Sequence, residues 1–163
     1  MNDDNTVQLE AAVLSFKKMR LGTFEMDYPF TDGQDVFILE SDGMIVPVKW
    51  SVTPYQCMMH HHGVVFLDVE AALDARDKRL LLVSINEFRK LRNDGWEPSF
   101  GGSSLKDAEP KWCIGFLDGD LFTRMDVTNC SFPMFGYFKK QDDARMAIML
   151  FGKEIKRLFC GEF

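Results

Sequence analysis

Three consecutive histidines, His60, His61 and His62, are the side chains of this sequence best suited to metal chemistry. On a strand, His60 and His62 would point the same way and could share a metal ion. Apart from Cys57, however, no cysteine or carboxylate stands at a spacing that would close a four-ligand shell. A loop of surface histidines explains the run better. We predict no metal site, and a small metal-dependent hydrolase built on these histidines is the last-ranked alternative.

Two other short motifs suggest ligand chemistry but fit simpler explanations. Asp118-Gly119-Asp120 lacks the later acids and the glutamate of a calcium loop, so it is better explained as a hairpin turn. Residues 101–104, Gly-Gly-Ser-Ser, lead into Pro110 and a strand, without the helix N-terminus that would help to bind a phosphate. The motifs of serine hydrolases, zinc proteases and P-loop proteins are absent. We predict no catalytic residue and no cofactor.

Aromatic residues accompany the long connector at residues 95–110, which is rich in Gly, Ser and Pro. Trp96, Phe100 and Trp112 could anchor a protein partner, stack on nucleic-acid bases or pack into the core. Few basic residues lie among them. A protein partner therefore fits Trp96 and Phe100 better than a nucleic acid does.

Composition narrows the class of protein. The chain has 163 residues, 46% of them hydrophobic, and a net charge of -6, so it can form one ordinary globular domain. The acidic balance gives no general attraction to phosphates and argues against direct binding to nucleic acid. No apolar run reaches the ~18 residues of a membrane span, and the four cysteines stand far apart. We expect a cytoplasmic protein with reduced thiols and no membrane association.

An internal repeat organises most of the chain. Apolar runs flank Asp42-Gly43 and again Asp118-Gly119, as in two hairpins. Phe66, Ala72 and Ala75 match Phe138, Ala144 and Ala147 at one constant offset. Each half then reads as strand, strand, strand and helix. The sequence predicts strands around residues 36–39, 44–50, 63–67, 111–117, 120–126 and 134–139, and helices at 6–21, 69–93 and 141–159.

This pattern predicts an α+β fold of two pseudo-repeated β-β-β-α units, at residues 35–94 and 111–160. The strands are expected to be antiparallel, with the helices packed on one side. Residues 1–34 would add an N-terminal helix and a connector to the single domain at 35–163. Residues 51–62 are expected to be irregular.

Turn and capping residues give sharper expectations. Asp42-Gly43 fits the two central positions of a type I′ turn. Pro47 cannot donate to a ladder, so its strand belongs at a sheet edge. Asp68 is placed to cap the helix that begins near Val69, and Gly95 stands beyond the end of that helix.

The order of these elements resembles a large group of small bacteriophage and prophage proteins. The likeness spans about residues 35–160 and omits the first 34. The helix start Val69-Glu70-Ala71 is less acidic than the Glu-Glu-Ala start usual in that group. The matching residues are Asp42, Gly43, Trp50, Gly63, Phe66, Ala72, Gly95, Trp96, Pro98, Trp112, Phe138, Ala144, Ala147, Ile155, Lys156, Leu158 and Phe159.

The resemblance implies a phage accessory protein that acts by binding, because small phage proteins include inhibitors of host defence such as anti-CRISPR proteins. The expected partner is then a Cas nuclease ribonucleoprotein. Acidic side chains at Asp118, Asp120 and Asp126 could occupy its basic nucleic-acid channel. The alternative is a structural or assembly protein that forms a homo-oligomer through the strand edge near Pro47 or through the long connector.

Overall fold

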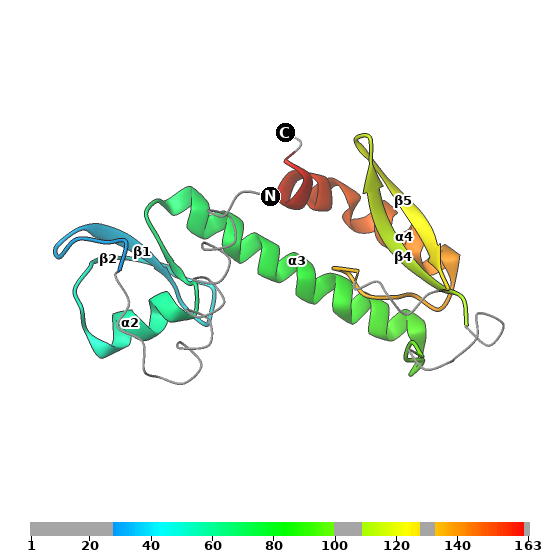
Figure 1. Cartoon of the computed structure of the whole chain (residues 1–163), viewed down its shortest axis with the longest axis horizontal. Helices are drawn as coiled ribbons and strands as arrows, with labels where there is room; N and C mark the ends of the chain where they lie inside the picture. The colour runs from blue at the N-terminus through cyan, green and yellow to red at the C-terminus, as the bar shows by residue number, and fades with distance from the viewer. Residues whose placement is uncertain (1–27, 100–108, 128–132, 162–163) are drawn as a thin grey trace, which may run out of the picture. The chain divides into compact units, whose positions relative to one another are not determined.

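The computed structural model describes residues 28–99, 109–127 and 133–161 (Figure 1). The chain divides into two compact units, Met1–Ala72 and Leu73–Phe163, and the boundary falls inside helix α3 (Val69–Asn93). The helix predicted at 6–21 lies outside the described residues, as does Phe100. Among the described residues, no helix is both long enough and apolar enough to span a membrane.

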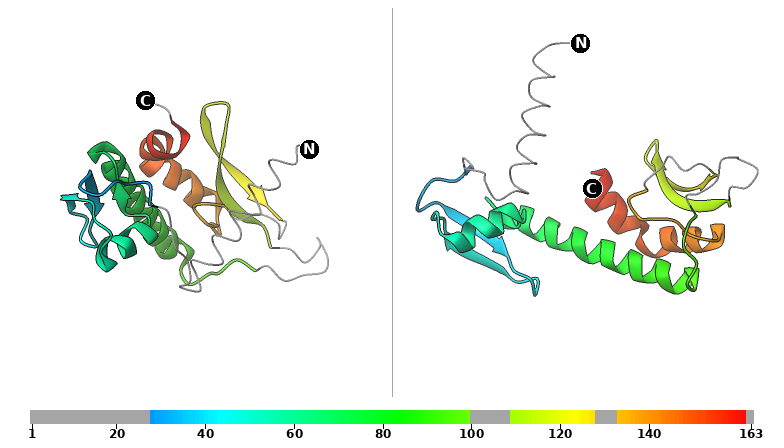
Figure 2. Two further views of the ribbon diagram at one scale, coloured as in Figure 1. Left: turned by 60° about the vertical axis from the view of Figure 1, so that its left-hand side comes forward. Right: turned by 60° about the horizontal axis from the view of Figure 1, so that its bottom comes forward.

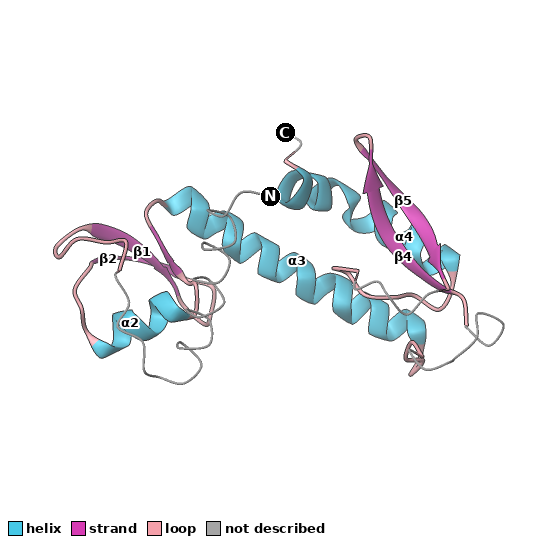
Figure 3. Ribbon diagram, viewed as in Figure 1, coloured by secondary structure: helices cyan, strands magenta, loops and turns pink. Residues whose placement is uncertain are grey.

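The first unit contains a three-stranded antiparallel sheet in the order β2-β1-β3 (Figure 3). Its strands are β1 (Asp35–Leu39), β2 (Ile45–Lys49) and β3 (Val65–Phe66). Pro47 of β2 faces Phe37 of β1, and β2 has no second strand neighbour among the described residues. The prediction that Pro47 lies in an edge strand is confirmed.

The first hairpin turns differently from the prediction. Gly43 N–H donates to the carbonyl of Glu40 at 3.0 Å, so Ser41 and Asp42 are the central residues of the turn. Gly43 follows with φ 87° and supplies the left-handed residue that rejoins β2. The predicted type I′ turn at Asp42-Gly43 is therefore wrong, and the Asp42 carboxylate instead accepts a hydrogen bond from the N–H of Met44.

Helix α2 (Pro54–His61) occupies most of the stretch that was expected to be irregular. Thr53 caps it by accepting a hydrogen bond from the N–H of Gln56, and Pro54 supplies a φ already suited to the first turn. The Gln56 amide also donates to the carbonyl of Lys49, which ties the helix start to the end of β2. This Thr-Pro-x-Gln pattern is a helix start signal in the sequence.

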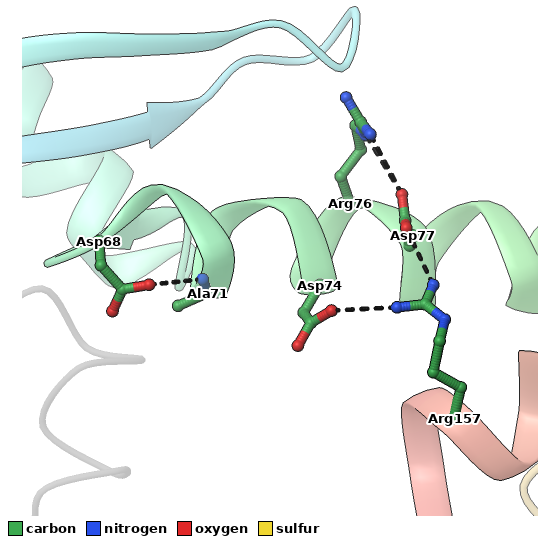
Figure 4. Close-up of polar contacts among 6 residues, drawn as sticks. All are labelled: Asp68, Ala71, Asp74, Arg76, Asp77 and Arg157. Carbon is green, nitrogen blue, oxygen red and sulfur yellow. Dashed lines mark hydrogen bonds and ion pairs between the residues drawn. The ribbon is translucent and has the colours of Figure 1, made fainter. Parts of the chain in front are cut away.

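Helix α3 agrees closely with its predicted bounds of 69–93. The Asp68 carboxylate accepts a hydrogen bond from the N–H of Ala71 at 2.7 Å, as expected of a cap (Figure 4). Asp94 and Gly95 follow the helix with φ 48° and 76°, and this left-handed pair ends it.

The second unit pairs the β4–β5 hairpin with helix α4 (Gln141–Ile155), which packs against both strands (Figure 2). Strands β4 (Lys111–Leu117) and β5 (Asp120–Asp126) have the predicted bounds. The third predicted strand, 134–139, is reduced to one bridge between Phe138 and Trp112. The N–H of Gly136 donates to the carbonyl of Pro133, so a turn stands where the predicted strand would begin.

Helix α4 continues into one π-helical turn, η2 (Lys156–Cys160), and Gly161 ends it at φ 71°. Arg92 of α3 binds the buried carboxylate of Asp143 at 2.6 Å. Arg157 bonds to Asp74 at 3.4 Å and to Asp77 at 3.0 Å (Figure 4). These pairs align α3 and α4 as antiparallel neighbours. The buried core between them and the hairpin consists of Leu81, Ile85, Ile114, Phe138, Ala144, Ala147, Ile155 and Leu158.

The coarse fold class is confirmed, because the described residues form an α+β structure with small antiparallel sheets and three α-helices. The two-fold repeat of the sequence stays a prediction.

Candidate functional site

The β4–β5 turn presents the candidate binding site. Leu117 pairs with Asp120, which leaves Asp118 and Gly119 as the two central residues. Their φ angles of 51° and 87° are both positive, so this turn has the type I′ character that matches the twist of a hairpin. We call Phe116, Leu117, Asp118 and Asp120 the hairpin tip.

The hairpin tip combines negative charge with exposed apolar surface. Leu117 is 63% exposed and Phe116 is 44% exposed, although both belong to an apolar strand run. Asp118 is exposed and forms no ion pair within the described part of the chain. The apolar run alone does not show this exposure, because Phe116 and Leu117 belong to the same run as buried Ile114.

Lys156 holds the turn from the side of η2. Its ammonium donates to the carbonyl of Gly119 and lies 3.2 Å from the carboxylate of Asp120. The Asp120 side chain is 89% exposed, so solvent screens this ion pair and its contribution to stability is small. The contact fixes where the turn points, and it leaves Asp118 as the carboxylate most available to a partner.

Asp126 lies at the opposite end of β5 from the hairpin tip. Six residue steps separate it from Asp120, which is about 20 Å along an antiparallel strand. Asp126 is 6% exposed, and its carboxylate accepts a hydrogen bond from the Tyr137 hydroxyl at 2.8 Å. The structure therefore brings Asp118 and Asp120 together and places Asp126 in a buried polar cluster.

The aromatic residues of the long connector are also separate from the hairpin tip. Trp96 is half-buried, and its indole N–H donates to the Glu109 carboxylate at 2.8 Å across the base of the connector. Trp112 packs against the core and pairs with Phe138, which is the packing role allowed for it by the sequence. Phe100 lies outside the described residues.

His60 and His61 are the last residues of α2 and His62 is its C-cap, so His60 and His62 do not share a face as they would on a strand. His60 packs edge-on against Trp50 and Phe30, with ring centroids 6.1 and 5.4 Å away. His61 also lies near the ring of Tyr28. Within the residues that the structure describes, no group of three His, Cys, Asp or Glu side chains could hold a metal ion.

Burial, with a smaller contribution from neighbouring His61, lowers the pKa of His60 below its ordinary value. Neutral His60 is thus favoured by the fold, and the unfolded chain binds more protons below about pH 6.5. The free energy of unfolding is expected to be highest above that pH and to fall as the pH decreases toward the lowered pKa of His60. Urea unfolding at pH 7.5 and pH 5.5 measures this effect.

Other groups also titrate in this range, so the contribution of His60 needs matched variants. His60→Phe keeps an aromatic ring against Trp50 and is expected to lose less stability between the two pH values than the wild type. His62→Gln removes an exposed histidine and should retain the wild-type pH dependence. Equal pH dependence in all three proteins would contradict the assignment to His60.

The hairpin tip is therefore a tight turn that exposes two apolar side chains beside Asp118, whose carboxylate forms no ion pair with the described residues. This arrangement suits binding to a surface that is basic and partly apolar. Comparison of the chain with protein-family models, with curated proteins and with solved structures found no match.

Proposed function

We propose that this protein acts by binding a basic surface of another protein through its hairpin tip. The target class that we propose is a bacterial defence nuclease, such as a CRISPR-associated nuclease with its guide RNA, whose nucleic-acid channel the tip would occupy. The observation that carries the proposal is the exposure of Leu117 and Asp118 on a type I′ turn. The resemblance to phage accessory proteins supports the choice of target.

Two physical effects favour binding through this turn. The net charge of -6 attracts a basic partner at long range, which raises the association rate and helps to exclude acidic partners. The turn is held in place by its own geometry and by Lys156, so little conformational entropy is lost when it docks. Exposed Leu117 then supplies apolar area beside the charge of Asp118.

The test is a binding measurement with purified, guide-loaded nucleases from several CRISPR classes, followed by DNA cleavage assays. For a nuclease that binds, Asp118→Asn is expected to weaken binding about tenfold, the effect of a charge contact worth ~1.4 kcal/mol. Asparagine tolerates the positive φ at this position, so the turn should remain folded. The wild-type affinity should also fall as salt is raised.

Asp32→Asn is the matched control, because Asp32 is also an exposed turn aspartate but belongs to the first unit. It should bind like the wild type and inhibit cleavage equally. An Asp118→Asn protein with unchanged affinity for a bound nuclease would exclude the tip as the contact. Failure to bind any nuclease, together with a stable homo-oligomer in sedimentation, would favour the assembly role instead.

We also infer that residues 35–94 and 111–160, the two predicted repeats, share one ancestral β-β-β-α plan. Phe66 pairs with Phe37 in β1, the first strand of the first hairpin. Phe138 pairs with Trp112 in β4, the first strand of the second hairpin. A helix follows each of these pairings, and Ala72 and Ala144 are both fully buried. These correspondences support the repeat that the sequence predicts.

A further inference from the structure

Arg89 differs from the other arginines on α3 in its surroundings. Arg76 and Arg92 each bind an aspartate, and Arg79 is exposed. Arg89 is half-buried, and its only hydrogen bond to a described residue goes to the neutral side-chain amide of Asn86, at 2.7 Å. A guanidinium carries five N–H donors, so most of its donor capacity remains unused within the described residues.

The side chain of Arg89 lies close to Gly136, in the turn at residues 133–136. A Cβ built on Gly136 would lie 2.8 Å from Nε and 3.0 Å from Cζ of Arg89, so any side chain at this position would collide with the guanidinium. Gly136 also has φ 72°, which a side chain would oppose. The glycine thus lets the Arg89 side chain approach the backbone closely.

Arg89 also lines a pocket between α3 and this turn. Its walls include Leu82, Asn86, Phe135 and Gly136. Arg89 is half-buried in this pocket, and its partial removal from solvent strengthens a charge-assisted hydrogen bond made there. The pocket volume of about 230 Å³ is below the roughly 300–1,000 Å³ of small-molecule sites. It therefore suits one side chain better than a whole small ligand.

We propose that this pocket binds the carboxylate of an acidic side chain, Asp or Glu, supplied by a protein partner. The planar guanidinium of Arg89 matches a carboxylate with two parallel hydrogen bonds, while Phe135 and Leu82 contact the methylene groups that carry it. Asn86 fixes the guanidinium by accepting one of its N–H groups. This contact is additional to the hairpin tip and has the opposite charge preference.

The test uses the full chain labelled with ¹⁵N and a probe that carries a single acidic side chain, N-acetyl-L-glutamate N-methylamide. Saturable changes in the NMR shifts of the Gly136 amide and of Arg89 Nε–H are expected. The glutamine analogue, which is neutral and of the same shape, should bind at least tenfold more weakly. Equal shifts with both probes would overturn the proposal, as would binding of inorganic phosphate in preference to the acidic probe.

Arg89→Gln should abolish saturable binding of the acidic probe, whereas Arg79→Gln, a matched charge removal on the same helix, should leave it intact. Arg89→Lys keeps the charge but loses the paired geometry, so its binding should be intermediate. Equal loss in the Arg79 and Arg89 variants would show a nonspecific charge effect and overturn the proposal. Asp118→Asn should not change binding of the probe, so the pocket and the hairpin tip are tested independently.

Discussion

Replacing Asn93 with alanine is expected to lower the free energy of unfolding of the second unit by about 3 kcal/mol. Asn93 is 3% exposed at the end of α3. Its amide donates to the carbonyl of Tyr137 at 2.9 Å, and its carbonyl accepts from the N–H of Lys139 at 3.0 Å. The alanine variant would leave both backbone groups without this partner, at roughly 1–3 kcal/mol each, and the better helix propensity of alanine offsets only about 0.6 kcal/mol.

Urea unfolding at pH 7 measures this loss, and Asn93→Asp provides the graded control. Aspartate can still accept a hydrogen bond from the N–H of Lys139 but cannot donate one to the carbonyl of Tyr137. Its negative charge also repels that carbonyl oxygen. Hydrogen exchange of the Lys139 amide should therefore increase strongly in Asn93→Ala and less in Asn93→Asp. A loss below about 0.5 kcal/mol for Asn93→Ala, the range of an ordinary surface substitution, would contradict the structural role.

The elements that the sequence predicts well are those specified by adjacent residues. Strands β4 and β5 follow from two apolar runs around Asp118-Gly119, and the observed turn has the positive φ angles that this dipeptide tolerates. Helix α3 follows from the Asp68 cap, a 3.6-residue apolar period and Gly95. In each case the local preference and the packing agree.

The predictions are wrong where a short sequence signal fits more than one local structure. The same Asp-Gly dipeptide at residues 42–43 forms a different turn. The N–H of Gly43 donates to the carbonyl of Glu40, whereas a turn centred on Asp42-Gly43 would have the N–H of Met44 donate to the carbonyl of Ser41. Helix α2 was missed although Thr53, Pro54 and Gln56 form a recognisable start. Its apolar pattern is weak, so only the residues at its start indicate a helix.

The buried polar contacts of the second unit could not be read from the sequence. Asn93 is 44 residues from Tyr137, and Arg92 is 51 residues from Asp143. Sequence periodicity does not indicate contacts between residues so far apart, so the sequence identifies Asn93 only as the end of a helix. The same limit explains why Asp126 was grouped with Asp118 and Asp120: their shared charge is visible in the sequence, whereas the Tyr137 hydroxyl that binds Asp126 is not.

Truncation of Phe138 to alanine is the second large expected effect, a loss of about 3–5 kcal/mol in the free energy of unfolding. The Phe138 ring is fully buried in the core and lies 6.4 Å from the ring of Phe88, measured between centroids. The variant removes this ring and leaves a cavity. The backbone hydrogen bonds between residue 138 and Trp112 need no side chain, so the bridge can persist.

Phe66→Ala is the control that the predicted repeat supplies. Phe66 occupies the matching position after the first hairpin, but it is only half-buried. Its truncation should therefore cost less than that of Phe138, since the transfer free energy scales with the apolar area removed from water. Hydrogen exchange measured separately in residues 35–66 and 111–158 shows which unit each variant affects. An equal or larger loss for Phe66→Ala would contradict the ranking of these two phenylalanines by burial.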